Sequence, residues 1–332
     1  MATMCLAAAR RFAREPAPSP KWSHPLQPPI AAGWGEENIR ATFNVVDFGA
    51  VGDGVANDTL PFRAAFAACE KTRGVAGRCE VLVPAGSYVV AGLDLVSNLV
   101  LKLVGSLLGP LTASAWLSPS SGFRIHSMLN VTGLANVSIL GPRTSAPGVD
   151  HLPDGSLSVT GEPDQLGGTL DGRARELWFA QCKRVDSFCY GSGRGSGLVL
   201  YVADSENVHV RGVQVVWGSV FPVQFRATSL LVENFGVLMP FVATRYNAYN
   251  VAGVGINNMA PIGYLGPLMH LRNVTVACGD DMFEVTGSRE TPTSNVLIED
   301  SCRQPTIESW TTTPAAGLNP GPPRQQDSRA VV

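Results

Sequence analysis

The sequence predicts an all-β protein, a single-stranded parallel β-helix with a short amino-terminal capping α-helix, on three observations. Charged residues make up only 16% of the 332 residues while Gly reaches 35, a balance that suits short strands and turns. Apolar runs bounded by Gly, such as VLVPAGSYVV and LVLKLVG, indicate strands. Similar segments recur late in the chain at steps of 22, 21, 23 and 22 residues, with strands that begin at Val208, Leu230, Val251, Val274 and Val296.

The late repeat indicates a solenoid, because self-similarity at a fixed period in the low twenties is typical of stacked structural units. The alternation in NVHV, NVTV and NVLI directs one apolar side chain inward at every second position. Leucine-rich repeats share the period, but their Leu pattern and helical half are missing. We therefore expect coils of short strands that bury apolar residues against one another, with Asn side chains stacked in ladders at the turns.

The amino-terminal part of the folded unit is expected to close one end of the solenoid. Residues 43–48 form an apolar run that predicts a strand. Residues 60–71 carry apolar side chains at helical spacing, with Asp58 or Thr59 as the capping residue. A helix at this place would cover strand edges that are otherwise unpaired.

The seven Cys residues do not describe a small disulfide scaffold, and no CxxC pair suggests a zinc site or a redox motif. Cys69 and Cys79 flank the end of the predicted helix and could close a small loop. Cys278 and Cys302 lie about one coil apart. Free buried thiols fit both pairs equally well.

The chain divides into one folded domain between two irregular ends. Residues 1–42 predict a poorly ordered extension, residues 43–302 the β-helix domain, and residues 303–332 a disordered tail. No secretory signal is recognisable, because the first Arg residues follow the apolar patch instead of preceding it. The longest uncharged run, 246–269, carries Asn and Pro and is a poor membrane span. A formal charge of −2 excludes strong attraction to nucleic acid or to an anionic membrane.

The strongest candidate for chemistry is the triplet Gly279-Asp280-Asp281. Neighbours in a regular strand point to opposite faces, so a bulge or turn at Gly279 would let both carboxylates face solvent. Adjacent carboxylates repel and one holds its proton more strongly, which leaves one acid and one base, as glycoside hydrolysis requires. An ordinary solvated turn is the alternative. We interpret His209 and His270, in or beside strands, as surface or satisfied core histidines.

Six segments of the sequence follow one another in a recognisable order. They are NVVDFGAVGDGVANDTLPFRAAFAAC (44–69), VLVPAGSYVVAGLDL (81–95), GGTLDG (167–172), SENVHVRGVQV (205–215), CGDDMFEVTGS (278–288) and NVLIEDSC (295–302). Together they resemble the polygalacturonases, glycoside hydrolase family 28, and the chain looks like a carboxyl-terminally truncated or diverged member. The resemblance implies a right-handed, pectin-lyase-like parallel β-helix.

The resemblance also implies an O-glycosyl hydrolase that cleaves α-1,4 bonds of pectin or polygalacturonan with inversion, in cell-wall polysaccharide metabolism. Asp280 matches the family's general acid, and Asp281 matches a residue that helps to activate water. Arg289 and Tyr249 are the candidate substrate-binding residues; Tyr249 could stack on a sugar ring, and packing in the core or on the surface is the alternative. The implied partner is a polysaccharide, the implied location is extracellular or cell-wall associated, and neither a metal nor an organic cofactor is implied. The oligomeric state does not follow from the sequence.

The sequence departs from the family pattern in two places, which leaves alternatives open. The family's third carboxylate, one coil before Asp280, falls at Val254, and no Asp occurs from Ser205 to Gly279. No His or Lys follows Asp281, so two further family motifs have no counterpart. One alternative is a catalytically degenerate carbohydrate-binding β-helix, and another is a calcium-dependent enzyme like the pectate lyases.

Overall fold

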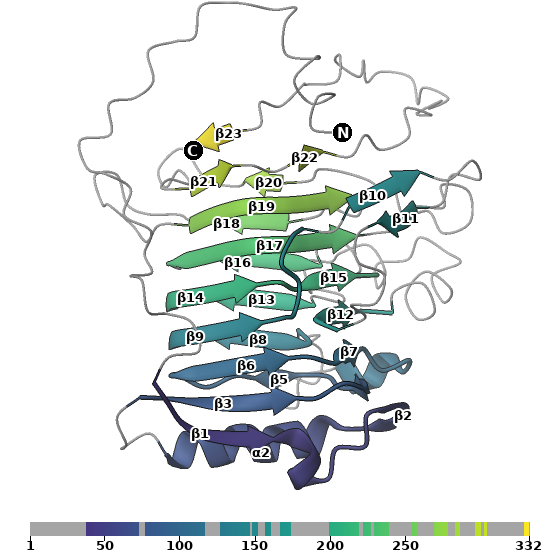
Figure 1. The fold of residues 1–332 in the computed structure, drawn as a ribbon, viewed down its shortest axis with the longest axis vertical. Helices are drawn as coiled ribbons and strands as arrows, with labels where there is room; N and C mark the ends of the chain where they lie inside the picture. Colours follow the sequence, from purple (N-terminus) through teal and green to yellow (C-terminus); the bar gives the residue numbers. More distant parts are fainter. Residues whose placement is uncertain are drawn as a thin grey trace, which may run out of the picture.

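The structure is a computed structural model that describes fifteen stretches of the chain. These are residues 38–72, 77–116, 127–146, 148–151, 157–160, 167–173, 199–218, 222–226, 229–238, 254–257, 269–277, 283–285, 296–299, 302–303 and 329–331. Within these ranges the chain rises as a column of stacked strands, with helix α2 (Thr59–Lys71) at its lower end (Figure 1).

The stacked strands form three faces of the column. The first face contains β1 (Ile39–Asn44), β3 (Arg78–Val83), β6 (Leu99–Leu103), β9 (Ala135–Leu140), β14 (Glu206–Arg211), β17 (Leu230–Leu238), β19 (Met269–Ala277) and β21 (Val296–Glu299). The second face contains β2 (Asp53–Asn57), β4 (Ser87–Val89), β7 (Ser106–Leu108), β12 (Thr169–Asp171), β15 (Gln214–Val216), the ends of β17 and β19, and β22 (Cys302–Arg303). The third face contains β5 (Leu93–Asp94), β8 (Leu129–Thr132), β13 (Leu200–Ala203), β16 (Val223–Arg226), β18 (Val254–Asn257) and β20 (Phe283–Val285).

The pairing along each of the three faces is parallel throughout the described strands. The first two faces belong to one 15-stranded sheet because β17 and β19 run through both, and the third face is a separate 6-stranded sheet. Antiparallel pairing occurs between β10 (Gly148–His151) and β11 (Leu157–Thr160), and between β21 and β23 (Arg329–Val331). This arrangement confirms the predicted right-handed parallel β-helix.

The core fills the interior of the column, because every second strand residue points inward. In β3 the residues Cys79, Val81 and Val83 are fully buried and alternate with partly exposed ones. On the third face, Leu129 and Leu200 occupy matching positions of adjacent coils and are also fully buried. Each coil therefore buries its apolar side chains against the coils above and below it.

The fixed period predicted for the late coils is correct for one step and wrong for the next. Val208 pairs with Leu230, 22 positions later, as predicted. Leu230 then pairs with Met269, so the predicted coil that starts at Val251, itself outside the described residues, does not intervene. Val274 pairs with Phe235 on the second face. The error arises because strands on all three faces share the same alternation while the connections between them differ in length.

The predicted asparagine ladders are present at two corners of the column. Asn136 donates to Asn98 Oδ1 at 2.7 Å, and Asn207 donates to Asn136 Oδ1 at 3.2 Å. At the corner between the first and second faces, Asn273 donates to Asn234 Oδ1 at 2.6 Å. All five residues have positive φ, a conformation that Asn tolerates better than most residues. The stacked amides thus link coils where the backbone turns.

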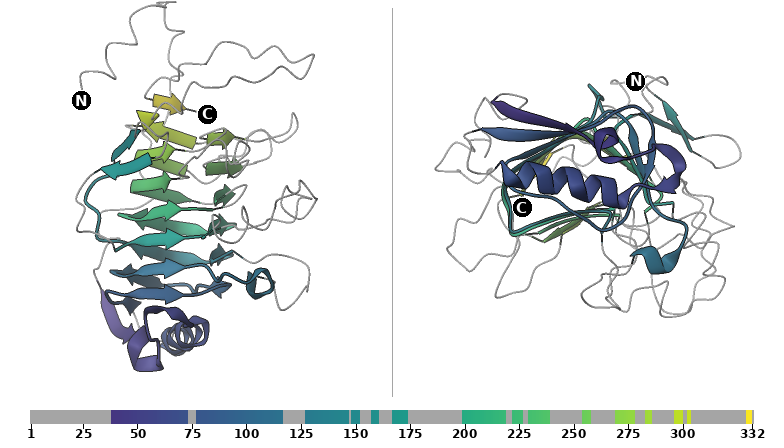
Figure 2. Two further views of the ribbon diagram at one scale, coloured as in Figure 1. Left: turned by 90° about the vertical axis from the view of Figure 1, so that its right-hand side faces the viewer. Right: turned by 90° about the horizontal axis from the view of Figure 1, so that it is seen from below.

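Helix α2 covers the lower end of the core, as the sequence predicted (Figure 2). Asp58 precedes the helix, but its carboxylate accepts the amide hydrogens of Val51 at 2.7 Å and Gly52 at 3.3 Å instead of capping α2. The strand predicted at residues 43–48 is partly wrong. It ends at Asn44, whose side chain accepts from the amide of Val46 and starts the 3-10 helix η2 (Val45–Phe48). A second such helix, η3, spans Ala113–Trp116.

Regular strands extend beyond both predicted boundaries of the folded domain. Strand β1 starts at Ile39, before the predicted start at residue 43, and pairs along its length with β3. Strand β23 lies within the predicted tail 303–332 and pairs with β21. Both strands are held by backbone hydrogen bonds to a neighbouring strand. Such bonds leave no signal in the pattern of side chains, so the sequence did not predict these boundaries.

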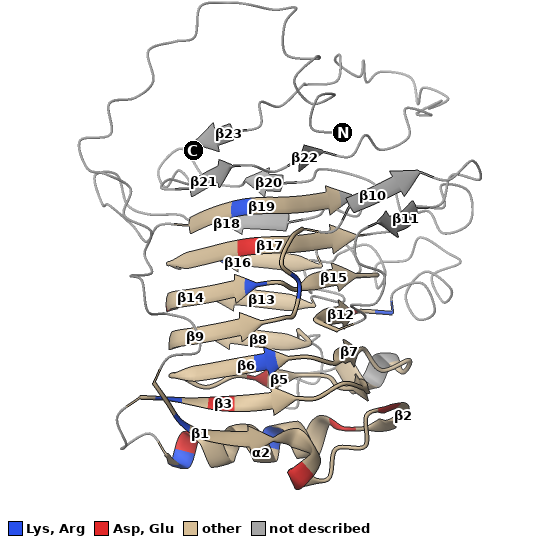
Figure 3. Cartoon of the chain, in the orientation of Figure 1, with Lys and Arg blue, Asp and Glu red and all other residues tan. Residues whose placement is uncertain are grey.

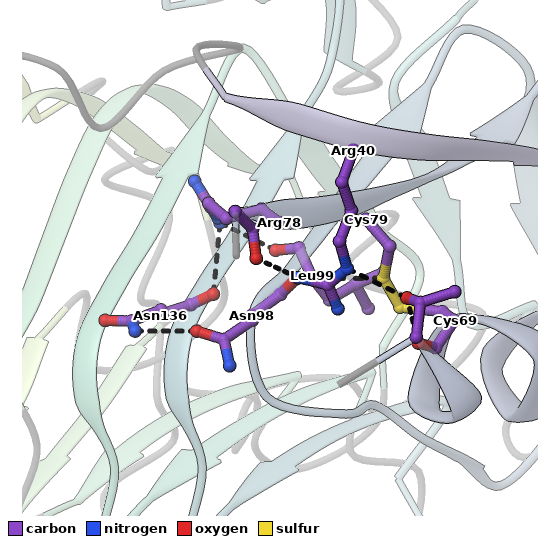
Figure 4. Close-up of a disulfide and its surroundings, with 9 residues drawn as sticks. Arg40, Cys69, Arg78, Cys79, Asn98, Leu99 and Asn136 are labelled. Carbon is purple, nitrogen blue, oxygen red and sulfur yellow. Dashed lines mark hydrogen bonds between the residues drawn. A yellow bond between two sulfur atoms is a disulfide. The ribbon is translucent and has the colours of Figure 1, made fainter. Parts of the chain in front are cut away.

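A disulfide joins the capping helix to the first full coil, where the sequence left a bond or free thiols open. Cys69 in the last turn of α2 and Cys79 in β3 have Cα atoms 5.7 Å apart (Figure 4). Nearby, Arg40 donates to Thr72 Oγ1 at 2.9 Å, and Arg78 donates to the carbonyl oxygen of Leu99 at 2.7 Å. The cap is therefore held to β1 and β3 by covalent and polar contacts.

Replacing Cys69 and Cys79 together by Ala is expected to lower the free energy of unfolding by about 2–3 kcal/mol. The cross-link spans 10 residues and restricts the unfolded chain. Urea unfolding with and without reductant would measure the effect. Reductant should destabilise only the parent chain, and equal destabilisation of the double variant would contradict this assignment.

Candidate functional site

The four site residues predicted from the sequence lie outside the described residues. Asp280 and Asp281 fall in residues 278–282, between the end of β19 and the start of β20. This segment leads from the second face to the third face of the column. Arg289 and Tyr249 also lie outside the described ranges, so their roles stay predictions.

The strand next to the predicted catalytic segment is β18, in agreement with the coil assigned from the sequence. Val254 pairs with Phe283 in β20 and with Val223 in β16. Phe283 follows Asp281 by two positions, so Val254 does not align with either Asp of the pair.

The corner between the second and third faces receives most of the long connections in the chain. These connections are residues 109–128, 172–199 and 239–253. By contrast, only residues 204–205 connect β13 on the third face to β14 on the first face. In solenoids, insertions on one side of the repeat often border the binding surface. The segment with Asp280 and Asp281 enters the same corner, which makes the adjoining third face our candidate site.

The outer side of the third face carries a continuous polar column. Register places Asp94, Asn130, Tyr201 and Gln224 beside one another on consecutive coils. Asn130 donates to Asp94 Oδ1 at 2.6 Å, and Thr132 donates to Asn130 Oδ1 at 2.7 Å. We call these five residues the third-face column.

Arg226 lies beside the third-face column, at the end of β16. Its side chain is exposed, and its backbone pairs in register with Ala203 of the coil below. Tyr201 is half-buried. Amides, a hydroxyl, an aromatic ring and a guanidinium together can hydrogen-bond a polar chain and pack against its rings.

The sequence analysis did not single out Tyr201, Gln224 or Arg226 as functional residues. Tyr201 in LVLYV and Gln224 in PVQFR lie between buried neighbours, and Arg226 follows the buried Phe225; that local alternation was the available signal. Their proximity depends on pairing between coils, which spacing along the chain does not reveal.

A second polar cluster joins three coils on the first face, where Figure 3 shows an acidic position on β17 and a basic position on β19. His209 Nε2 lies 2.9 Å from Glu233 Oε2, and Arg272 Nε donates to Glu233 Oε1 at 2.7 Å. The pKa of the Glu233 carboxyl falls from its ordinary 4.5 to about 2, chiefly through the hydrogen bond from His209 and further through Arg272, while burial opposes the shift. The cluster therefore holds a stable carboxylate between two coils.

His209 is 5% exposed. The Nε2 atom of its ring contacts Glu233, and the Nδ1 atom is buried without a hydrogen-bond partner among the described residues. This environment fits the core histidine expected from the sequence, with one ring nitrogen satisfied. His270 lies in the same outward row of the first face and is 9% exposed. We assign the first-face cluster to the linkage of coils.

The described part of the chain shows no membrane-spanning helix, since none of its helices is long and apolar enough to cross a bilayer. In those same ranges, no three His, Cys, Asp or Glu side chains are grouped so that they could hold a metal ion.

Comparison with known proteins shows the fold and leaves the family open. No family model matches the chain. Mannuronan C5-epimerase AlgE1 of Azotobacter vinelandii is 33% identical over 139 residues, which are 41% of this chain and 9% of the epimerase. The chain thus matches less than a tenth of that relative's length.

Two solved structures resemble the column described above. A candidate glycosyl hydrolase from Parabacteroides merdae superposes with a TM-score of 0.55 at 12% identity, over 79% of this chain and 95% of that one. The family 28 exopolygalacturonase of Yersinia enterocolitica gives 0.49 at 20% identity, over 76% of this chain and 47% of that one. At 12% identity, the likeness to the Parabacteroides merdae structure shows a shared fold alone.

Proposed function

We propose that this chain is a polysaccharide-active enzyme that hydrolyses the α-1,4 bonds of polygalacturonan, the acidic backbone of pectin. The proposal rests chiefly on the place of Gly279-Asp280-Asp281, in the connection that enters the third face one coil after β18. A paired carboxylate in this connection would lie toward the polar outer side of the third face and the corner of the long connections. A secreted or cell-wall location belongs to the same proposal, because pectin is a wall polymer.

In this mechanism Asp280 protonates the glycosidic oxygen while Asp281 takes a proton from the attacking water. Inversion requires the acid and the base to stand roughly 6.5–9.5 Å apart across the sugar, so that water fits between base and anomeric carbon. The third-face column would hold the polymer in register with this pair. Tyr249 and Arg289 would add contacts to the substrate.

A second candidate function is C5 epimerisation of a uronan, which the likeness to the mannuronan epimerase favours. Epimerisation removes the C5 proton of a uronate and returns one to the opposite side of the ring. It breaks no glycosidic bond, so it creates no reducing ends. The two candidates share an acidic polysaccharide and differ in the product.

The test is product analysis after incubating the purified full chain with polygalacturonate or polymannuronate at mildly acidic pH, with and without calcium. Hydrolysis predicts new reducing ends without unsaturated sugars, and a double variant, Asp280→Asn with Asp281→Asn, should produce none. Inverted C5 centres without chain cleavage would replace the hydrolase by the epimerase. Calcium-dependent unsaturated ends would indicate a lyase, and retention of polymer without turnover would indicate a binding protein.

A further inference from the structure

Arg226 is a positively charged side chain on the outer side of the third face. Val223 and Phe225 of the same strand are fully buried, so Gln224 and Arg226 project outward. Strand β16 pairs with β18, and β18 pairs with β20, which begins just after the predicted catalytic pair. Because adjacent parallel strands lie about 4.8 Å apart, β16 is displaced from β20 by about 10 Å along the column.

Among the residues that the structure describes, none forms a hydrogen bond or an ion pair with the guanidinium of Arg226. Several other described arginines are engaged, for example Arg63 with the carbonyl oxygen of Gly92 at 2.8 Å and Arg272 with Glu233. Asp204 adjoins Arg226, since its amide donates to the Arg226 carbonyl oxygen at 3.1 Å, but no ion pair joins the two side chains. Arg226 therefore keeps its planar set of donors available for a carboxylate.

Gln224 flanks Arg226 on its own coil, and Tyr201 lies on the coil below. Tyr201 pairs with Gln224 in register, and Arg226 lies two positions beyond Gln224 on the same side of the strand. Within the described ranges, neither the hydroxyl of Tyr201 nor the side-chain amide of Gln224 has a hydrogen-bond partner. Directly below Arg226 lies Ala203, whose short side chain gives the guanidinium no partner.

We propose that Arg226, Tyr201 and Gln224 form a subsite for one uronate unit of an acidic polysaccharide. Arg226 binds the carboxylate, the aromatic ring of Tyr201 packs against the C–H face of the sugar, and Gln224 hydrogen-bonds a ring hydroxyl. The inference rests on the proposed action on a polysaccharide and adds the recognition of its charge. Arg226 thereby determines the preference for an acidic chain over a neutral one.

The test compares Arg226→Gln with Arg211→Gln in binding to two forms of one polymer. Arg211 lies on the first face and likewise has no side-chain partner among the described residues, so it is a matched control. The ligands are oligogalacturonate and the same oligomer with every carboxyl methyl-esterified. Titration calorimetry uses the full chain with Asp280 and Asp281 both replaced by Asn, and circular dichroism checks each fold.

Arg226→Gln should weaken binding of the acidic oligomer by about tenfold or more and leave the esterified oligomer unchanged, because a charged hydrogen bond is lost in one case only. Arg226→Lys should recover part of the loss, and Arg211→Gln should have no effect. Equal weakening for both oligomers, or none for either, would overturn the subsite. If the parent chain cleaves polygalacturonate and Arg226→Gln leaves the KM unchanged, the subsite alone is overturned. If the parent chain neither binds nor cleaves polygalacturonate, the proposed function is overturned as well.

Discussion

Replacement of Asp280 by Asn is expected to lower the rate of reducing-end release from polygalacturonate by at least about 100-fold. A general acid contributes roughly 10²–10⁴-fold by protonating the leaving oxygen, and the amide of Asn has no such proton to give. The substitution preserves the shape of the side chain. We therefore expect kcat to fall while KM changes little, since the polymer would still be held along the third face.

Two comparisons separate loss of the acid from loss of the fold. Asp281→Asn should reduce the rate by a similar order, because it removes the proposed base. Asp47→Asn, at an exposed position in the amino-terminal 3-10 helix, should leave the rate unchanged. Equal thermal unfolding temperatures in all variants would show intact folding, and more than a tenth of the parent rate in Asp280→Asn would place the acid elsewhere.

Replacement of Glu233 by Gln is expected to destabilise the column by about 1–2 kcal/mol at neutral pH. The folded pKa of Glu233 is about 2 against an ordinary 4.5, and each unit corresponds to about 1.4 kcal/mol, which sets an upper bound of about 3 kcal/mol. Because the side chain of Arg272 is half exposed, screening by water reduces this value. The amide cannot attract Arg272 as the carboxylate does, so β14, β17 and β19 lose a charged link.

The pH dependence follows from the lowered pKa of Glu233. The stabilisation is fully present above about pH 4.5, where the unfolded carboxyl is ionised, and is lost as the pH falls toward 2, where the folded carboxyl gains its proton. Urea unfolding between pH 7 and pH 2 should therefore show a shallower acid slope for Glu233→Gln than for the parent. Glu206→Gln, at the exposed start of β14, is the control and should behave like the parent. Identical slopes in Glu233→Gln and the parent would contradict the assigned linkage.

The structural features that depend only on residues close together along the chain could be predicted from the sequence alone. The alternation in β3 and β14, the apolar spacing of α2 and the Asn residues at turns are local signals, because a side chain's direction follows from its position in the strand or helix. Because only a short loop separates Cys69 from Cys79, a disulfide was one of the two possibilities that the sequence left open, and the structure shows this bond. The same local patterns singled out Asp280 and Asp281, although they did not give a register for Val254.

The tertiary structure decided which coils lie side by side. Asn98 lies 38 residues before its ladder partner Asn136, which in turn lies 71 residues before Asn207. Backbone hydrogen bonds between coils depend on where each connection returns, and connections of unequal length carry no periodic signal. Only the folded register therefore brings Tyr201 beside Gln224 and places Glu233 between His209 and Arg272. The chain thus encodes its β-helix locally, whereas the candidate binding surface exists only once the coils are stacked.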